Sequence, residues 1–67
     1  MEPVTLASSA IHQVRYDEKK KELDVLFVDG TFSSYKNVPL KVYQELISTD
    51  SVGYFFNTEI RGKYAFS

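Results

Sequence analysis

Residues 51–64, SVGYFFNTEIRGKY, constrain the fold of this chain most strongly, because their apolar residues recur at helical spacing. At about 100° per residue, the period of an α-helix, one arc carries Val52, Phe55, Phe56 and Ile60. The opposite arc carries Tyr54, Asn57, Thr58 and Arg61. We therefore expect one face of this helix to seal a core, while the other face is available for binding.

Signals at both ends delimit this predicted helix. Ser51 is a suitable N-cap, because its hydroxyl can accept a hydrogen bond from an amide two or three residues on, although Thr49 and Asp50 also fit. Gly62 suits the left-handed C′ position that ends many helices. Arg61 lies in the last turn, where a cation complements the helix dipole. Its position therefore has a structural explanation beside a ligand-binding one.

Three segments upstream of this helix have strand-like composition. Residues 10–16 mix β-branched and aromatic residues with polar ones, residues 22–28 form the clearest strand, and residues 31–36 form the third. Asp29-Gly30 separates the last two segments and is typical of a two-residue type I′ hairpin. The segments therefore predict a β-meander.

A two-residue loop at Asp29-Gly30 would fix which side chains share a sheet face. One face would carry Leu23, Val25, Phe27 and Phe32, and the other would carry Asp24, Leu26, Val28, Thr31, Ser33 and Tyr35. The first face is the expected bed for the helices. The second would be exposed, and its members Leu26, Val28 and Tyr35 predict a contact surface, either for a homo-oligomer or for a ligand.

A second, shorter helix is predicted after Pro39, which suits the first helical position because its missing amide proton is not needed there. Its apolar stripe is Leu40, Tyr43, Leu46 and Ile47. Residues 1–9 are expected to form an extended N-terminal lead-in, and residues 10–67 a single domain. The expected fold class is α+β, a three-stranded antiparallel β-meander followed by two short α-helices packed on one face.

Composition narrows the possible functions. The 67 residues include no cysteine and one histidine, His12, which excludes disulfide frameworks and the common Cys/His zinc sites. Self-association is then the remaining way for so small a core to add buried area. The net charge of −1 argues against an extended polyanion as partner. No apolar run approaches the roughly 20 residues that span a bilayer, and no secretory signal is present, so we expect a cytoplasmic protein.

The sequence contains no recognisable catalytic constellation. His12 stands on a strand without the Ser and Asp spacing of a triad, and the carboxylates are scattered over turns and helix faces. No glycine-rich phosphate loop is present. We therefore expect no enzymatic activity, no cofactor and no metal site.

A group of residues in the second half of the chain carries a family resemblance. The group is Val38-Pro39, Val42-Tyr43, Ser51, Gly53, Phe55 or Phe56, Asn57, Ile60, Arg61 and Tyr64. With these residues the chain resembles the KTSC domain over roughly residues 8–66, most specifically at Phe56-Asn57, Ile60-Arg61 and Tyr64. That family is named for its occurrence at the carboxy-terminus of some lysyl-tRNA synthetases, and it also includes small stand-alone proteins.

The resemblance implies a compact α+β domain without established enzymatic activity, and the association with a tRNA synthetase suggests RNA binding. The family also shows a Tyr-any-Tyr motif before its Val-Pro. Here that motif reads Ser33-Ser34-Tyr35, so Tyr35 matches and Ser33 departs. If stacking on both tyrosines is part of the family's binding, this chain has lost half of it.

The polar arc of the predicted C-terminal helix is suited to binding. Arg61 offers a planar fork of donors for phosphate, and aromatic rings beside a guanidinium and an amide can stack a base. The candidate ligand-binding residues are Arg61, Asn57, Tyr54, Lys63, Tyr64 and Tyr35. In the structural alternative, Tyr54 and Tyr64 are core aromatics, Asn57 bonds to hairpin backbone, and Arg61 pairs with Asp24 or Glu59.

Three functions remain open at this point. The first is a non-catalytic homo-oligomer that captures a small nucleotide or a nucleotide-derived signal, such as a cyclic dinucleotide. The second is an RNA-binding module, which suits the family name but suits the net charge poorly. The third is a protein–protein interaction domain that uses Leu26, Val28 and Tyr35.

Overall fold

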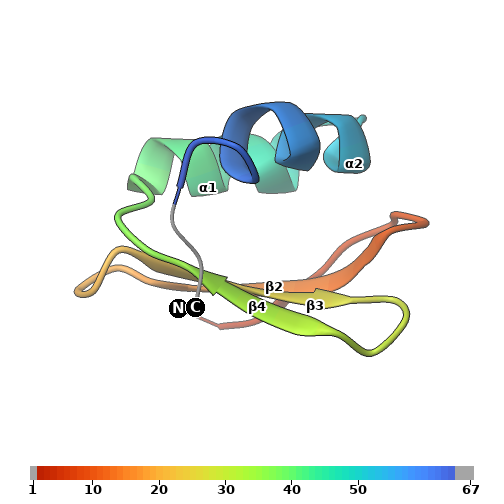
Figure 1. Cartoon of the computed structure of the whole chain (residues 1–67), viewed down its shortest axis with the longest axis horizontal. Coiled ribbons are helices and arrows are strands. Elements are labelled where there is room, and N and C mark those ends of the chain that lie inside the picture. The colour runs from red at the N-terminus through yellow and green to blue at the C-terminus, as the bar shows by residue number, and fades with distance from the viewer. Residues whose placement is uncertain (1, 65–67) are drawn as a thin grey trace.

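The structure, a computed structural model, describes residues 2–64 and has two layers, a sheet and a layer of helices on one of its faces (Figure 1). The elements are β1 (Val4–Thr5), β2 (Ile11–Asp17), β3 (Glu22–Phe27), β4 (Phe32–Tyr35), α1 (Leu40–Ser48), α2 (Val52–Phe55) and the π-helical η1 (Phe56–Ile60). The sheet is antiparallel, with strand order β1-β2-β3-β4. The predicted α+β class is confirmed.

The sheet has four strands, whereas the sequence predicted three. The additional strand is β1, which lies in the expected lead-in and pairs Val4 with Val14 and Thr5 with Gln13. Two residues are too few for a period-2 pattern to appear, so only the pairing with β2 identifies this strand. β1 extends the sheet beyond β2.

The predicted two-residue hairpin is wrong. Residues 28–31 separate β3 from β4, and the hydrogen bond between Phe27 and Thr31 closes a three-residue loop, residues 28–30. The Phe27 amide donates to the Thr31 carbonyl at 2.8 Å, and the Gly30 amide donates to the Phe27 carbonyl at 3.0 Å. A type I′ turn needs positive φ at both central residues, but in this loop only Gly30 has it, at +94°. The Asp29 carboxylate instead accepts from the Thr31 amide at 3.0 Å, which stabilises the wider loop.

This one-residue difference moves every side chain of β4 to the opposite sheet face. Leu23 pairs with Tyr35 and Leu26 pairs with Phe32, where the two-residue loop predicted Asp24 with Tyr35 and Phe27 with Phe32. Tyr35 is consequently buried under the helices, with 4% of its surface exposed, whereas Phe32 is 62% exposed. The prediction that Tyr35 shares an exposed face with Leu26 and Val28 is therefore wrong.

The core lies between the sheet and the helices. Its fully buried members come from both layers: Ile11, Val14, Tyr16, Leu23, Val25, Val38, Leu46 and Ile60. The Tyr16 ring stacks on Tyr43 of α1 at 5.0 Å between ring centroids, and its hydroxyl donates to the Val38 carbonyl at 2.6 Å. Phe56 meets Phe27 and Tyr35 edge-on at 5.6 and 5.4 Å. These contacts fix both helical segments to the sheet.

Both predicted helices exist, and their apolar faces are as expected. In α1, Tyr43 and Leu46 are buried, and Leu40 and Ile47 pack against the core. In the second helical segment, Val52, Phe56 and Ile60 are buried, whereas the opposite arc of Tyr54, Asn57, Thr58 and Arg61 includes no buried residue. The helical periodicity therefore predicted both core-facing stripes correctly.

The second helical segment differs from the prediction at both ends and in its middle. Ser51 is the N-cap residue but makes no side-chain cap bond. The Arg61 amide donates five residues back, to the Phe56 carbonyl at 2.9 Å, so η1 is a π-helical turn. Gly62 does not have positive φ, because the amides of Lys63 and Tyr64 continue the turn by donating to Ile60. The predicted left-handed C′ position is therefore absent from Gly62.

Candidate functional site

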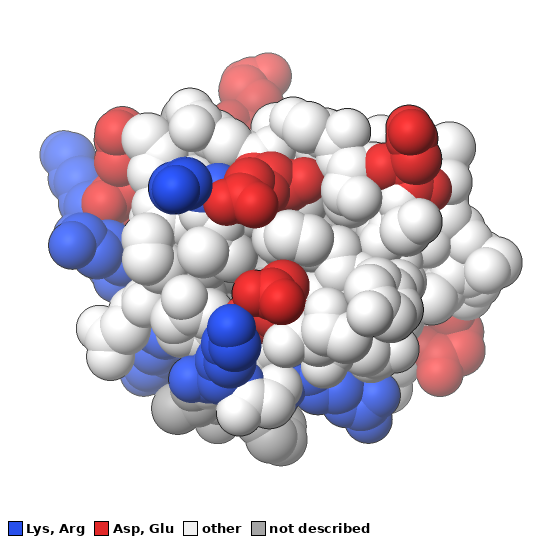
Figure 2. Space-filling view, turned by 90° about the horizontal axis from the view of Figure 1, so that it is seen from above, with Lys and Arg blue, Asp and Glu red and all other residues white. Residues whose placement is uncertain are grey.

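Charged residues of both signs are interspersed on the helix side of the molecule, without a continuous basic stripe (Figure 2). A long polyanion would need such a stripe, whereas a ligand with one or two phosphates needs only a local group of donors. No helix among residues 2–64 is long and apolar enough to cross a membrane. The hollows of the surface are therefore the candidate sites for a small polar ligand.

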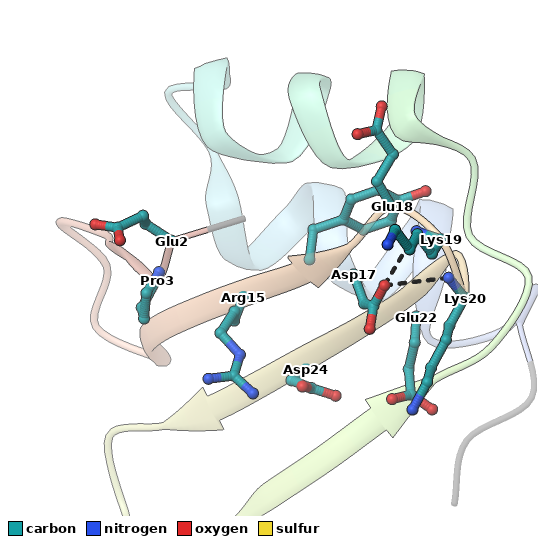
Figure 3. A pocket seen from close by; sticks show the side chains of 10 residues that line it. Glu2, Pro3, Arg15, Asp17, Glu18, Lys19, Lys20, Glu22 and Asp24 are labelled. Atoms are coloured by element: carbon teal, nitrogen blue, oxygen red, sulfur yellow. Dashed lines mark hydrogen bonds between the residues drawn. The ribbon is translucent and has the colours of Figure 1, made fainter.

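One hollow of the surface, about 700 Å³ in volume, lies beside the β2–β3 turn (Figure 3). Its charged lining comprises five carboxylates and three cations: Glu2, Asp17, Glu18, Glu22 and Asp24 with Arg15, Lys19 and Lys20. Asp17 already accepts from the amides of Lys19 and Lys20 at 3.0 and 3.2 Å, and these bonds lower the pKa of its carboxyl. An anionic ligand would meet an excess of negative charge here.

A smaller hollow of about 300 Å³ lies between the β3–β4 loop and the second helical segment. Phe27, Val28 and Asp29 line it from the hairpin, and Gly53, Phe56, Asn57 and Arg61 line it from α2 and η1, with Ala10 and Ile11 completing it. An adjoining hollow of about 500 Å³ shares Phe27, Asp29 and Arg61 with this 300 Å³ hollow. It is also lined by Thr31, Ser33 and Tyr35. We call these two hollows together the hairpin groove.

Arg61 lines both parts of the hairpin groove. Its Nη1 donates to Oδ1 of Asn57, one turn earlier, at the long distance of 3.4 Å. Among residues 2–64 the ion pair joins Lys63 to Glu59, at 3.1 Å, so neither Asp24 nor Glu59 pairs with Arg61. The guanidinium therefore keeps donors directed toward the groove without a carboxylate partner in the described part of the chain.

Tyr35 and Arg61 are brought together by the observed register. Tyr35 lies on the helix side of the sheet, where burial raises the pKa of its phenol above 10.0 and the nearby Arg61 charge opposes that shift. Ser33, which departs from the family's Tyr-any-Tyr motif, lines the same hollow. A small side chain thus stands in the groove where the resemblance implies an aromatic ring.

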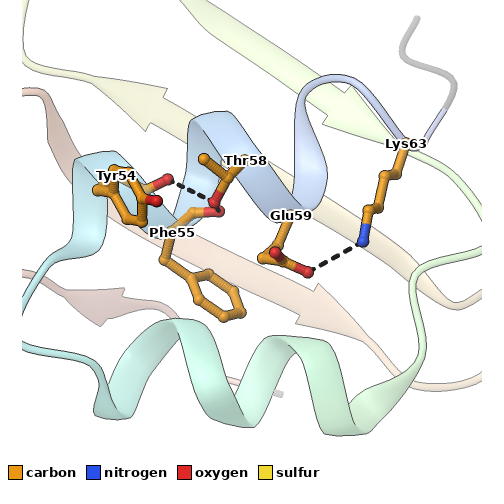
Figure 4. Close-up of polar contacts among 5 residues, drawn as sticks. All are labelled: Tyr54, Phe55, Thr58, Glu59 and Lys63. Carbon is orange, nitrogen blue, oxygen red and sulfur yellow. Dashed lines mark hydrogen bonds and ion pairs between the residues drawn. The ribbon is translucent and has the colours of Figure 1, made fainter.

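The other three candidate residues do not line the hairpin groove. Tyr54 is 74% exposed, and its carbonyl accepts from the Thr58 hydroxyl at 2.9 Å (Figure 4). Lys63 is held by Glu59, as the same view shows. Tyr64 is half-buried against the core. The structure therefore brings together Arg61, Asn57 and Tyr35 out of the six candidates.

Sequence reasoning missed Phe27 as a site candidate, and it also missed a charged groove residue, Asp29. Its Oδ1 accepts from both the amide and the hydroxyl of Thr31, and the hydroxyl bond, followed by the amide bond, lowers the pKa of the Asp29 carboxyl. The groove thus contains a carboxylate as well as the Arg61 guanidinium. The Asp-Gly pair indicated a turn, but no sequence signal placed that turn opposite the helix end.

The described residues offer no site for a metal ion. Within residues 2–64, no three His, Asp or Glu side chains come together closely enough to hold one. The hairpin groove instead combines a guanidinium, an amide, a carboxylate and aromatic surface. Such a set can bind a ligand that has an anionic group at one end and hydrogen-bond donors elsewhere.

Comparison with known proteins places this chain in a family. An uncharacterized protein of Stutzerimonas stutzeri is 39% identical over 57 residues, which cover 85% of this chain and 80% of that protein. A lysine–tRNA ligase of Nostoc punctiforme is 36% identical over 58 residues, and this chain spans only 10% of its length. The crystal structure of the KTSC domain protein YPO2434 from Yersinia pestis has a TM-score of 0.93, with 29% identity, and the match covers 98% of this chain and 93% of that one. Because the KTSC domain model also matches residues 7–64, the chain belongs to the KTSC domain family.

Proposed function

We propose that this protein is a non-catalytic, homo-oligomeric binding protein of the cytoplasm that captures a small nucleotide, such as a cyclic dinucleotide, in the hairpin groove. The observation that carries the proposal is the position of Arg61, which lines both parts of the groove and has no carboxylate partner among residues 2–64. A guanidinium with free donors is suited to a phosphate group.

The remaining groove residues fit the other parts of a nucleotide. Phe27 lines both parts of the groove, and an aromatic residue there can supply apolar surface for a base. The Asn57 amide beside Arg61 can add a donor to phosphate or bond to a base edge. The Asp29 carboxylate can accept from ribose hydroxyls or base N–H groups, and it disfavours a ligand that carries many phosphates.

The test measures binding of a panel of linear and cyclic nucleotides by native mass spectrometry and calorimetry. Arg61→Ala is expected to weaken binding by at least roughly 10-fold, because a charge-assisted hydrogen bond contributes about 1.5–3 kcal/mol. Lys63→Ala is the matched control, because it removes a nearby cation that does not line the groove. If no nucleotide binds, or if Arg61→Ala binds as well as the wild type, the proposal is wrong.

RNA binding is the second candidate, and the match to a segment of a lysine–tRNA ligase favours it. A short single-stranded RNA belongs in the same panel, with binding measured at several salt concentrations. The affinity of a polyanion binder falls steeply as salt rises, whereas a ligand held at one guanidinium responds weakly. RNA binding with a steep salt slope, without nucleotide binding, would replace the first proposal with the second.

A further inference from the structure

The hairpin wall of the groove, Phe27 and Asp29, offers a ligand a carboxylate that is held in place. Oδ1 of Asp29 accepts from both the amide and the hydroxyl of Thr31, whereas Oδ2 accepts no hydrogen bond from another residue within 2–64. The Thr31 hydroxyl and amide bonds lower the pKa of the Asp29 carboxyl, so the group is ionised at neutral pH and can only accept. Both lone-pair sites of Oδ2 are therefore available to donors of a ligand.

The helix wall of the groove, Asn57 and Arg61, offers donors. Oδ1 of Asn57 accepts from Nη1 of Arg61 at 3.4 Å, which leaves the Asn57 Nδ2 group as a donor without a partner in the described part of the chain. Asp29 and Arg61 line both hollows of the groove without forming an ion pair, so a ligand can lie between them. A complementary ligand thus presents donors to the hairpin wall and acceptors or negative charge to the helix wall.

We propose that the hairpin groove selects guanine among the bases, with Oδ2 of Asp29 accepting from the ring N1–H and the exocyclic N2–H₂ group. The inference rests on the proposed nucleotide capture and narrows its ligand to a guanine nucleotide. Guanine has two adjacent donors on its Watson–Crick edge. Adenine and cytosine have an acceptor nitrogen beside a single amino group, and uracil has one ring N–H between two carbonyl oxygens. A carboxylate repels those acceptors, so guanine is the base that suits Asp29.

Phe27 supports the placement of the base against the hairpin wall. It lies two residues before Asp29, and both residues line both hollows of the groove. Unstacked bases are commonly recognised by stacking on an aromatic residue together with hydrogen bonds to their edges. With the guanine donors at Asp29, the O6 and N7 acceptors and the phosphate are left for the donors of Asn57 and Arg61. One guanine nucleotide therefore satisfies both walls.

The first test compares guanosine, inosine and adenosine monophosphate (GMP, IMP and AMP) on the wild type by calorimetry. Cyclic di-GMP and cyclic di-AMP form a second matched pair. The guanine member of each pair is expected to bind at least roughly 10-fold more tightly than the adenine member, which is the usual order of discrimination for a base-specific pair of hydrogen bonds. IMP keeps N1–H but lacks the 2-amino group, so its affinity is expected to lie between those of GMP and AMP.

The second test uses Asp29→Asn, whose amide oxygen can still accept from Thr31 and whose folding circular dichroism checks. We expect GMP to bind this variant at least roughly 10-fold more weakly, whereas AMP loses no affinity, because an amide donor can face the guanine N–H groups but not accept from both. Asp17→Asn is the matched control. Asp17 also accepts from turn amides and has a lowered pKa, but it does not line the hairpin groove, so this variant should keep the guanine preference.

The outcomes separate this inference from nucleotide capture itself. Equal affinities for GMP and AMP in the wild type, or an Asp29→Asn variant that keeps the guanine preference, would overturn the inference and leave nucleotide capture in place. An Asp29→Asn variant that loses GMP and AMP equally would also overturn it, because the carboxylate would then accept from the ribose hydroxyls that both nucleotides share. If none of these nucleotides binds, the proposed function fails and the inference fails with it.

Discussion

Tyr16→Phe removes one buried hydroxyl from the contact that fixes the start of α1 to the sheet. Tyr16 is 1% exposed and Val38 is 0% exposed, and the hydroxyl donates to the Val38 carbonyl at 2.6 Å. The substitution keeps the ring that stacks on Tyr43 at 5.0 Å and so leaves no large cavity. Its principal effect is a buried carbonyl that loses a donor, which costs about 1–3 kcal/mol.

A loss of this size is readily measurable in so small a domain. At about 0.05–0.15 kcal/mol per residue, the free energy of unfolding of a 67-residue chain is roughly 3–10 kcal/mol. Each kcal/mol lost should lower Tm by about 4–8 °C. Thermal and urea unfolding followed by circular dichroism provide the assay, with concentration held fixed because self-association also affects stability.

Tyr54→Phe is the matched control for Tyr16→Phe. Tyr54 is 74% exposed, and its hydroxyl makes no hydrogen bond within the described part of the chain. Removing that hydroxyl should change the free energy of unfolding by less than about 0.5 kcal/mol. If Tyr16→Phe has the same Tm and the same urea midpoint as Tyr54→Phe and the wild type, the reasoning about the Val38 contact is refuted.

Two further predictions concern the hairpin. Tyr35→Ala should lower the free energy of unfolding by roughly 3–5 kcal/mol, because it empties a buried aromatic site, whereas Phe32→Ala in the monomer should change it by less than about 0.5 kcal/mol. Urea unfolding at low protein concentration measures both, and the reverse order would support the two-residue loop instead. The pKa of Asp29 lies below 3.8 in the folded state because of its Thr31 bonds, so its stabilisation is present above that value and lost as pH falls through the lowered pKa. Asp29→Asn should therefore lose less unfolding free energy than the wild type as the pH falls, which urea unfolding at several acidic pH values measures. Asp17, whose pKa is also lowered, should account for part of the loss that remains. If Asp29→Asn has the same pH profile as the wild type, Asp29 does not stabilise the fold in this way.

Helical periodicity was the most reliable guide to the fold. The burial of Val52, Phe56 and Ile60, and the absence of burial at Asn57 and Arg61, followed from spacing alone. The π-helical turn was not predictable, because its hydrogen bonds shift by one residue while the same residues still face the core. The residues of the polar arc were therefore predicted correctly, although the predicted α-helical backbone is π-helical over η1.

The hairpin register could not be read from the sequence. Asp29-Gly30 fits a two-residue loop and also a three-residue loop with Gly30 in the left-handed conformation. The choice depends on how Asp29 bonds to Thr31, which appears only in three dimensions. A one-residue slip exchanges the sheet faces. The two-residue loop therefore predicted Tyr35 on the exposed face and Phe32 on the face under the helices, which is the reverse of the structure.

The candidate site was predicted in part. Arg61 and Asn57 share the groove as their helical spacing suggested, and Tyr35 joins them from β4. Tyr54 was nominated because it lies two turns before Arg61 on the polar arc, and Lys63 because it closely follows Arg61 in sequence, but neither residue lines the groove. Asp29 was missed because its position opposite the helix end depends on packing between segments about 30 residues apart in sequence.

The most direct test of the central proposal is an NMR titration of the ¹⁵N-labelled protein with the nucleotide that binds best in the panel. The account predicts that the shifted amides gather around Phe27–Ser33 and Asn57–Gly62, the two walls of the hairpin groove. The same titration of Arg61→Ala should show these shifts only at much higher nucleotide concentration. Shifts that gather on the outer sheet face or around Lys19 and Lys20, or no shifts at all, would contradict it.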